Sequence, residues 1–168
     1  MSLTLILMRH AKSAWDDPTQ EDFDRPLNGR GRQSAKAIGD WLVGRGYLPD
    51  EVIVSAARRT VETWSRMVKG FPQTTAMQSN PALYLASADT ILGVVKTAQV
   101  PTIMVIAHNP GIGQFARDIT KTPARHPKFQ QYPTGATTVV TFDAETWDAV
   151  TWRSGEVADF AVPRELLG

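Results

Sequence analysis

The residues best suited to chemistry stand near the beginning of the chain, in the sequence Arg9-His10-Ala11-Lys12-Ser13. They follow an apolar run over 3–8 that is too short for an ordinary helix and is typical of a strand covered on both faces. In α/β folds, ligand-binding and catalytic groups collect at the carboxyl ends of buried strands. An imidazole beside a guanidinium at such a point predicts an anion site that contains a nucleophile or a base.

The same pattern occurs twice more along the chain. The apolar segment 51–55 leads into Arg58-Arg59, and the apolar segment 102–107 leads into His108-Asn109-Pro110-Gly111. One histidine after a strand is weak support for a site, but two of the three histidines occupy such positions here. Guanidinium groups suit the geometry of phosphate. The sequence therefore predicts a phosphate-binding site at one edge of a sheet.

The segment 13–28 has the composition of an ordered loop, because it contains two prolines and four aspartates, namely Asp16, Asp17, Asp22 and Asp24. These carboxylates lack the spacing of a known oxygen-ligand loop for a metal ion. We expect Asp24 and Arg25 to tie the loop down. The third histidine, His126, lies in a proline-containing segment and is expected at the surface.

Composition limits the classes of protein to which the chain can belong. Its 168 residues predict one domain over 1–168. With 18 Lys and Arg against 17 Asp and Glu, the net charge is only +1, which argues against nucleic acid or an anionic membrane as partner and makes any basic character local. There is no cysteine, so disulfides, thiolate nucleophiles and cysteine zinc sites are excluded.

No stretch reaches the ~20 apolar residues that a membrane span needs, and the N-terminal run lacks the features of a signal peptide. We therefore expect a cytoplasmic protein, and a monomer.

Strands and helices alternate along most of the chain, which favours an α/β fold. One helix is expected from Asn28 to stop signals at Gly44 and Gly46, and a second through Val61 and Trp64 to Lys69-Gly70. Two more are expected over 91–95, with Asp89 as cap, and over 112–119. Beyond the three strands already named, a short strand is expected around 74–77. Two further strands, 135–142 and 146–152, would form an antiparallel edge. The tail 155–168 is expected to be peripheral.

Taken in order, these segments carry a resemblance. The motifs are Met8-Arg9-His10-Ala11-Lys12-Ser13, Asp24-Arg25-Pro26-Leu27-Asn28 with Gly31, the spacing Ser55...Arg59...Thr63, Leu83-Tyr84, His108-Asn109-Pro110-Gly111 and Tyr132-Pro133-Thr134-Gly135-Ala136. Together they resemble the histidine phosphatase superfamily, with its phosphoglycerate mutase-like fold, and within it the small SixA-like phosphohistidine phosphatases. The resemblance implies a three-layer α/β sandwich: a mainly parallel central sheet, an antiparallel edge strand and helices on both faces.

The resemblance also implies a role for particular residues. His10 would be the nucleophile that becomes transiently phosphorylated, and the phosphate pocket would be completed by Arg9, Arg59 and His108. Arg59 is preferred to Arg58 because it satisfies the family spacing from Ser55 to Thr63. Residues in positions that contact the substrate would be Lys12, Ser13 and Asn109. No cofactor and no metal are implied.

The proton donor is not identified by the resemblance. Relatives that act on sugar phosphates carry a glutamate after the second helix, and the segment 81–86 contains none. Candidate donors are Asp16, Asp17 and His108. The absent glutamate fits a phosphohistidine substrate, because an imidazole can leave already protonated whereas an alkoxide needs an acid.

The sequence is compatible with more than one function. The substrate is expected to be a phosphorylated protein, specifically its phosphohistidine, with a small phosphomonoester as the alternative. A phosphate- or phosphopeptide-binding module with an inert His10 would keep the same pocket without turnover. A metal-dependent phosphohydrolase that uses the aspartates near Trp15 is the third reading.

Overall fold

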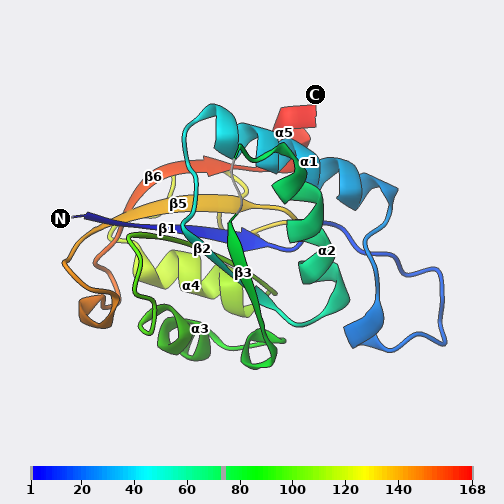
Figure 1. Ribbon diagram of the computed structural model, residues 1–168, viewed down its shortest axis with the longest axis horizontal. Helices are drawn as coiled ribbons and strands as arrows, with labels where there is room; N and C mark the ends of the chain where they lie inside the picture. Colours follow the sequence, from blue (N-terminus) through cyan, green and yellow to red (C-terminus); the bar gives the residue numbers. More distant parts are fainter. Residues whose placement is uncertain (1, 73–74, 168) are drawn as a thin grey trace.

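The computed structural model describes residues 2–72 and 75–167, and its centre is one six-stranded sheet of order β3-β2-β4-β1-β5-β6 (Figure 1). Four neighbouring strands run parallel, whereas β5 runs antiparallel to both β1 and β6. The strands are β1 (Ser2–Arg9), β2 (Glu51–Ser55), β3 (Ala76–Asn80), β4 (Thr102–Ala107), β5 (Thr137–Asp143) and β6 (Glu156–Ala161). The expected α/β sandwich with a mainly parallel sheet is confirmed, and its antiparallel strand lies one position in from the edge.

Helices cover both faces of this sheet. In Figure 1, α1 and α5 lie above it and α3 and α4 below it, and α2 packs against α1 on the same face of the sheet. The α-helices are α1 (Gly29–Gly44), α2 (Arg58–Met67), α3 (Ala88–Val95), α4 (Gly111–Ile119) and α5 (Pro163–Leu167). Short 3-10 helices are η1 (Asp22–Asp24), η2 (Val68–Gly70), η3 (Pro81–Leu83) and η4 (Trp147–Ala149). No helix of the described ranges is long and apolar enough to cross a membrane.

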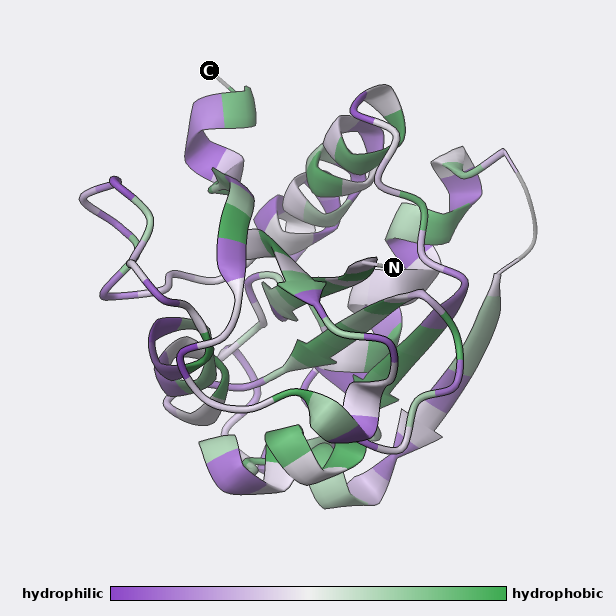
Figure 2. Cartoon of the chain, turned by 90° about the vertical axis from the view of Figure 1, so that its left-hand side faces the viewer, coloured by the Kyte–Doolittle hydropathy of each residue, from purple (hydrophilic) through white to green (hydrophobic). Residues whose placement is uncertain are grey.

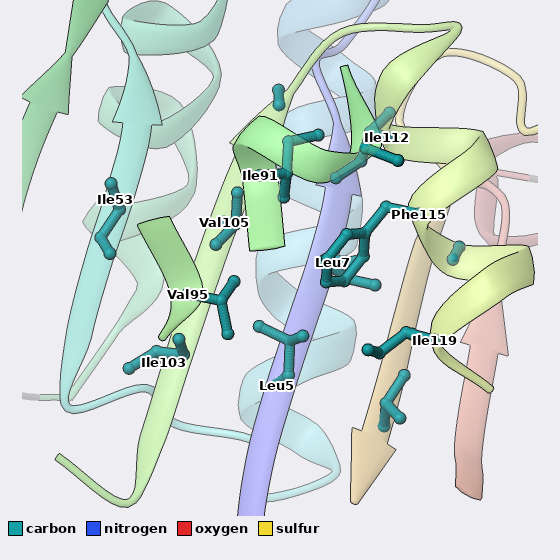
Figure 3. Packing of buried hydrophobic residues seen from close by; sticks show 14 of the residues in the cluster. Leu5, Leu7, Ile53, Ile91, Val95, Ile103, Val105, Ile112, Phe115 and Ile119 are labelled. Carbon is teal, nitrogen blue, oxygen red and sulfur yellow. The ribbon is translucent and has the colours of Figure 1, made fainter. Parts of the chain in front are cut away.

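The first strand forms the middle of the core because both of its faces are buried. Leu5 and Leu7 point into the layer formed with α3 and α4 (Figure 3), and Ile6 and Met8 pack into the layer formed with α1 and α2. Side chains alternate between the two faces of a strand, so a continuous apolar run can serve both layers. Figure 2 shows the same separation, with hydrophobic strands inside and hydrophilic residues on the outer loops and helix surfaces.

The parallel register places the three strand ends next to one another. Arg9 at the end of β1 pairs with Ala107 at the end of β4, and β4 pairs on its other side with β2, which ends at Ser55. The carboxyl ends of these strands therefore meet at one edge of the sheet, where β1 points and where the long blue loop after it extends in Figure 1. This arrangement brings His10, the start of α2 and His108 together.

One strand prediction was wrong. Segment 146–152 forms no strand; it contains η4, with Trp147 buried against Phe142 and its Nε1–H donating to Val100 O at 2.6 Å. The second antiparallel strand is instead β6, inside the tail that was expected to be peripheral. Its charged residues, including Glu156 and Asp159, mark an exposed edge strand rather than a loop.

Two smaller predictions also need adjustment. The cap of α3 is Ser87, whose side chain accepts a hydrogen bond from Thr90 N, whereas Asp89 lies within the first turn. The short strand expected around 74–77 begins at Ala76, and Thr74 lies outside the described residues. The remaining helices and the strands over 51–55 and 102–107 lie where the sequence predicted them.

Candidate active site

A cleft of about 420 Å³ lies at the strand ends. Its lining combines the residues that follow β1, the start of α2, the turn after β4 and the loop before β5: Arg9, His10, Lys12, Ser13, Trp15, Arg25, Arg30, Arg59, Leu85, His108, Asn109 and Thr134. These lining residues include five cationic side chains besides the two histidines and no carboxylate. The arrangement favours an anionic ligand.

His10 is held in one neutral form by its own backbone. The residue is 6% exposed, and its Nδ1 lies 2.7 Å from Ala11 O. Because a carbonyl oxygen only accepts, Nδ1 carries the proton and Nε2 keeps an unshared electron pair. The Ala11 peptide is fixed in turn by its N–H, which donates to Thr63 Oγ1 of α2 at 3.0 Å. His10 is therefore arranged as a nucleophile or base at Nε2.

The surroundings also keep this ring uncharged. Burial lowers the pKa of His10, the hydrogen bond to Ala11 opposes that effect, and His108, Arg59 and Arg9 lower the pKa further by like-charge repulsion, to about 3. The ring is thus neutral at neutral pH, with its single proton on Nδ1.

Gly135 fixes the backbone on the other side of His10. Its N–H donates to His10 O at 2.9 Å, and its φ of +78° lies in the left-handed region that favours glycine. A Cβ at this position would come within 2.4 Å of Pro163 Cγ. The segment that ends in Gly135 therefore positions the strand end as well as lining the cleft through Thr134.

Two guanidinium groups flank the histidine. Arg59 donates from Nη1 to Asp22 O at 2.7 Å and from Nη2 to Asp22 Oδ2 at 3.1 Å, and Arg9 donates from Nη1 to Tyr132 O at 3.2 Å. The Nε atoms of both arginines are buried without a hydrogen-bond partner. Each guanidinium group thus has one buried N–H, at Nε, that is available to a ligand.

His108 stands beside His10, with 5.2 Å between the ring centroids. Its Nε2 lies 2.7 Å from Ser55 Oγ at the end of β2, and its Nδ1 is buried without a partner. Burial and the Arg59 charge lower the pKa of His108 to about 3. In the described part of the chain, the buried side-chain nitrogens and oxygens that lack partners are Arg9 Nε, Arg59 Nε and His108 Nδ1. Buried polar groups are normally paired, so this clustering indicates a ligand site.

The residue that organises this arrangement, Asp22, was not singled out by sequence reasoning. Besides binding Arg59, its carboxylate accepts from Arg25 Nε at 3.1 Å and Nη2 at 3.0 Å, and from the Tyr84 hydroxyl. Burial alone would raise the pKa of Asp22, but hydrogen bonds from Tyr84, Arg25 and Arg59 lower it to about 2. Asp22 is therefore ionised at neutral pH.

The expectation that Asp24 and Arg25 tie the loop down is half right. Arg25 does so through Asp22, Ser13 and Ala14 O, but Asp24 does not take part in these bonds. The spacing of three residues between Asp22 and Arg25 inside a short helical turn was the available signal.

Comparison with known proteins decides the family. A family model described as the histidine phosphatase superfamily (branch 1) matches residues 5–84. A SixA protein of Nakamurella multipartitia, provisionally assigned as a phosphohistidine phosphatase, superimposes with a TM-score of 0.81 at 25% identity, covering 97% of each chain. The chain belongs to the histidine phosphatase superfamily.

Two further proteins are similar to this chain. A SixA protein of Agrobacterium tumefaciens, also provisionally assigned, superimposes with a TM-score of 0.78 at 26% identity and covers 96% of this chain and 98% of its own. An uncharacterised chloroplastic protein of Arabidopsis thaliana is 35% identical over 127 residues, which are 66% of this chain. The chain spans 56% of the length of that relative. The prediction of a SixA-like phosphatase is confirmed at the level of family and fold.

The residues expected to contact substrate differ in which hydrogen-bonding groups they have free. Lys12 is exposed on the cleft wall, and the hydroxyl of Ser13 accepts from Arg25 Nη1 at 2.7 Å. Asn109 donates both amide hydrogens to backbone, at 3.1 Å to Gln131 O and 3.0 Å to Tyr132 O. The side chain of Asn109 thus fixes the turn that carries His108 and has no amide hydrogen left for a phosphate.

Neither candidate acid of the Trp15 loop lines the cleft. Asp16 and Asp17 are exposed, and Asp17 accepts hydrogen bonds from the backbone and side chain of Thr19, which lower its pKa. Residues that line the cleft but were not predicted to do so are Arg25, Arg30, Leu85 and Thr134. Within 2–72 and 75–167, no group of three or more His, Asp or Glu is placed to hold a metal ion.

Proposed function

We propose that this protein hydrolyses phosphohistidine in proteins, without a metal ion, through a phosphoenzyme intermediate on His10 Nε2. The observation that carries the proposal is the hydrogen bond from His10 Nδ1 to Ala11 O. That bond leaves Nε2 as the unprotonated ring nitrogen, and the low pKa of the ring keeps it so at neutral pH.

The reaction consists of two in-line displacements. In the first, the electron pair of His10 Nε2 forms a bond to phosphorus, the bond to the leaving group breaks, and the leaving group takes the electron pair. In the second, a water oxygen bonds to phosphorus, the phosphorus–nitrogen bond breaks, its electron pair returns to Nε2, and the proton of the water passes to the phosphate or solvent.

Charge on the transferred group is met by the neighbouring donors. A phosphoryl group in transfer carries negative charge on three equatorial oxygens, so catalysis depends chiefly on positioning and electrostatic stabilisation. Arg9, Arg59 and His108 each bring a buried nitrogen that lacks a protein partner. These are the groups expected to hold the phosphate.

The lack of an acid in the cleft supports the choice of substrate. No carboxyl group lines the cleft, and Asp22, behind Arg59, has a pKa of about 2 and carries no proton to donate at neutral pH. An imidazole whose second nitrogen is protonated leaves as a neutral molecule, whereas an alkoxide requires a proton. Phosphohistidine therefore suits this cleft better than an alkyl phosphomonoester.

The test is trapping of the intermediate. Wild-type protein incubated with a phosphohistidine protein and then quenched in alkali, which preserves phosphorus–nitrogen bonds, should carry phosphate on His10. His10→Ala should lower turnover by about 10³-fold or more while still binding tungstate as an oxyanion. The double variant Asp16→Asn/Asp17→Asn is the matched control and should turn over like wild type.

Other outcomes distinguish the alternatives. Oxyanion binding without any turnover by wild-type protein would favour a phosphate-binding module. Loss of activity on treatment with a chelator would favour a metal-dependent enzyme. A larger kcat/KM for small phosphomonoesters than for phosphohistidine protein would reverse the substrate assignment.

A further inference from the structure

A second hollow, of about 560 Å³, opens beside the catalytic cleft. We name it the flanking groove; it lies between the first half of α1, the start of α5 and the loop 126–134. It shares three lining residues, Lys12, Arg30 and Thr134, with the catalytic cleft. A ligand whose phosphoryl group lies at His10 can therefore continue into the flanking groove.

Apolar side chains form much of the surface of the groove. Pro127, Pro133, Val162 and Pro163 line it, and the last two are buried beneath it. Proline offers no backbone N–H and a rigid apolar ring. This surface suits aliphatic parts of a polypeptide.

The rim of the groove is cationic. Lys12, Arg30, Lys128 and Arg164 are exposed, and within the described ranges none of them forms an ion pair. The carboxylate of the groove belongs to Glu165, which pairs with His126. A chain of net charge +1 thus gathers four unpaired cations around one hollow. Such a concentration attracts an acidic partner.

The geometry points to the flanking groove as the binding site for an acidic segment of the substrate protein, adjacent in space to its phosphohistidine. The inference rests on the proposed function, since it adds a subsite to the same reaction. Two exposed apolar residues line the catalytic cleft but not the groove: Trp15, which is 77% exposed, and Leu85, which is 57% exposed. Contact surface thus extends beyond the phosphoryl site in more than one direction, which suits a macromolecular substrate better than a small phosphoester.

Polypeptide is favoured over single-stranded nucleic acid by the composition of the groove. Nucleic-acid grooves combine cations with aromatic side chains on which bases stack. No Phe, Tyr or Trp lines the flanking groove. The apolar surface is aliphatic. We therefore assign the negative charge that the groove attracts to glutamate and aspartate side chains of the substrate protein.

The experiment uses two synthetic peptides with a central phosphohistidine, one flanked by glutamates and the other by glutamines. Wild-type protein should show a kcat/KM ratio in favour of the glutamate peptide that falls as NaCl is raised. Lys128→Glu/Arg164→Glu, which changes residues of the groove outside the catalytic cleft, should lower that ratio about tenfold. The neutralised pair Lys128→Gln/Arg164→Gln should give a smaller loss.

The matched control reverses two exposed cations elsewhere, Arg66→Glu/Lys69→Glu, near the end of α2 and in η2. The net-charge change is the same, and the ratio should stay at the wild-type value. An equal fall in the control, an unchanged ratio in the groove variant, or tighter binding of an oligonucleotide than of the glutamate peptide would overturn the inference.

A binding measurement separates this inference from the proposed function. Fluorescence anisotropy of the labelled peptides without phosphate needs no turnover. Preferred binding of the glutamate peptide that the groove variant loses supports the groove even if no peptide is hydrolysed, an outcome that would remove the proposed function alone. Hydrolysis of both peptides at equal kcat/KM, with equal binding, would remove the groove inference alone.

Discussion

A histidine attacks phosphorus only through a ring nitrogen that carries no proton, and the environment of His10 selects that form twice over. The Ala11 carbonyl 2.7 Å from Nδ1 decides which nitrogen is protonated. Burial and the nearby cations decide that only one is, since the pKa is about 3. The cations expected to hold the phosphate therefore also keep the nucleophile neutral.

Asp22 is predicted to position Arg59 for this reaction. Its carboxylate and carbonyl accept two hydrogen bonds from the guanidinium while Nε of Arg59 stays unpartnered. Asp22→Asn removes the charge that holds Arg59, so kcat/KM for phosphohistidine protein should fall about tenfold. Because Arg59 is expected to act on the transferred group, the fall should appear in kcat more than in KM.

Asp24→Asn is the matched control for Asp22→Asn. Asp24 lies in the same 3-10 helix, is exposed, and has no side-chain hydrogen bond among the described residues. Its substitution should leave both constants at wild-type values. Equal effects of the two substitutions would contradict a positioning role for Asp22.

The sequence identified the residues that follow strands and missed the one that joins loops. His10, Arg59 and His108 each follow an apolar run, and that pattern is visible locally. Asp22 contacts Arg59 and Tyr84 from 37 and 62 residues away. Its spacing from Arg25 is a local signal, but nothing in the sequence links Asp22 with Arg59 or Tyr84, so only the folded chain reveals these two partners.

At the scale of elements, the start of α1 supports the loop that follows His10. Asn28 caps the helix by accepting from Gly31 N at 2.8 Å. A Cβ on Gly31 would come within 2.0 Å of Lys12 O. Gly31→Ala should therefore push the helix and the loop apart, lowering the free energy of unfolding by about 2–3 kcal/mol and lowering turnover as well.

Gly44→Ala, at the other end of the same helix, is the matched control for Gly31→Ala. A Cβ there would meet nothing within 4 Å, and alanine is favoured over glycine in a helix by about 0.5–1 kcal/mol. The two substitutions should change stability in opposite directions in urea unfolding. Equal stability of Gly31→Ala and wild type would contradict the close approach.

The strands near the site were predictable because they are buried on both faces, whereas the distal edge was not. Strands β2 and β4 occupy 51–55 and 102–107 as the apolar runs indicated. Segment 146–152 resembled a strand through its aromatic and β-branched residues, but burying Trp147 beneath the sheet requires the chain to turn there. Strand β6 carries charges because one side of it faces solvent at the edge of the sheet.

At the scale of the whole molecule, burial at the carboxyl ends of the strands makes protonation of the two site histidines unfavourable. His10 and His108 are both buried at the end of the sheet, close to Arg9 and Arg59. The overall charge is only +1 at neutral pH, so general charge repulsion is small near neutrality. Mild acid should therefore act on stability mainly through these two rings.

The sign of that effect follows from proton linkage. Both pKa values fall from 6.5 in the unfolded chain to about 3 in the folded protein, so the unfolded state binds more protons between these values and stability drops as pH falls below 6.5. Each ring contributes a slope of up to about 1.4 kcal/mol per pH unit. The free energy of unfolding in urea should depend steeply on pH between pH 6.5 and about 4.5, above the range in which Asp22 titrates. His10→Gln should reduce the number of protons taken up on unfolding by about one. A wild-type free energy of unfolding that stays constant over this interval would mean that the two rings are not buried as neutral groups, and the nucleophile would then lack the form that the proposed reaction requires.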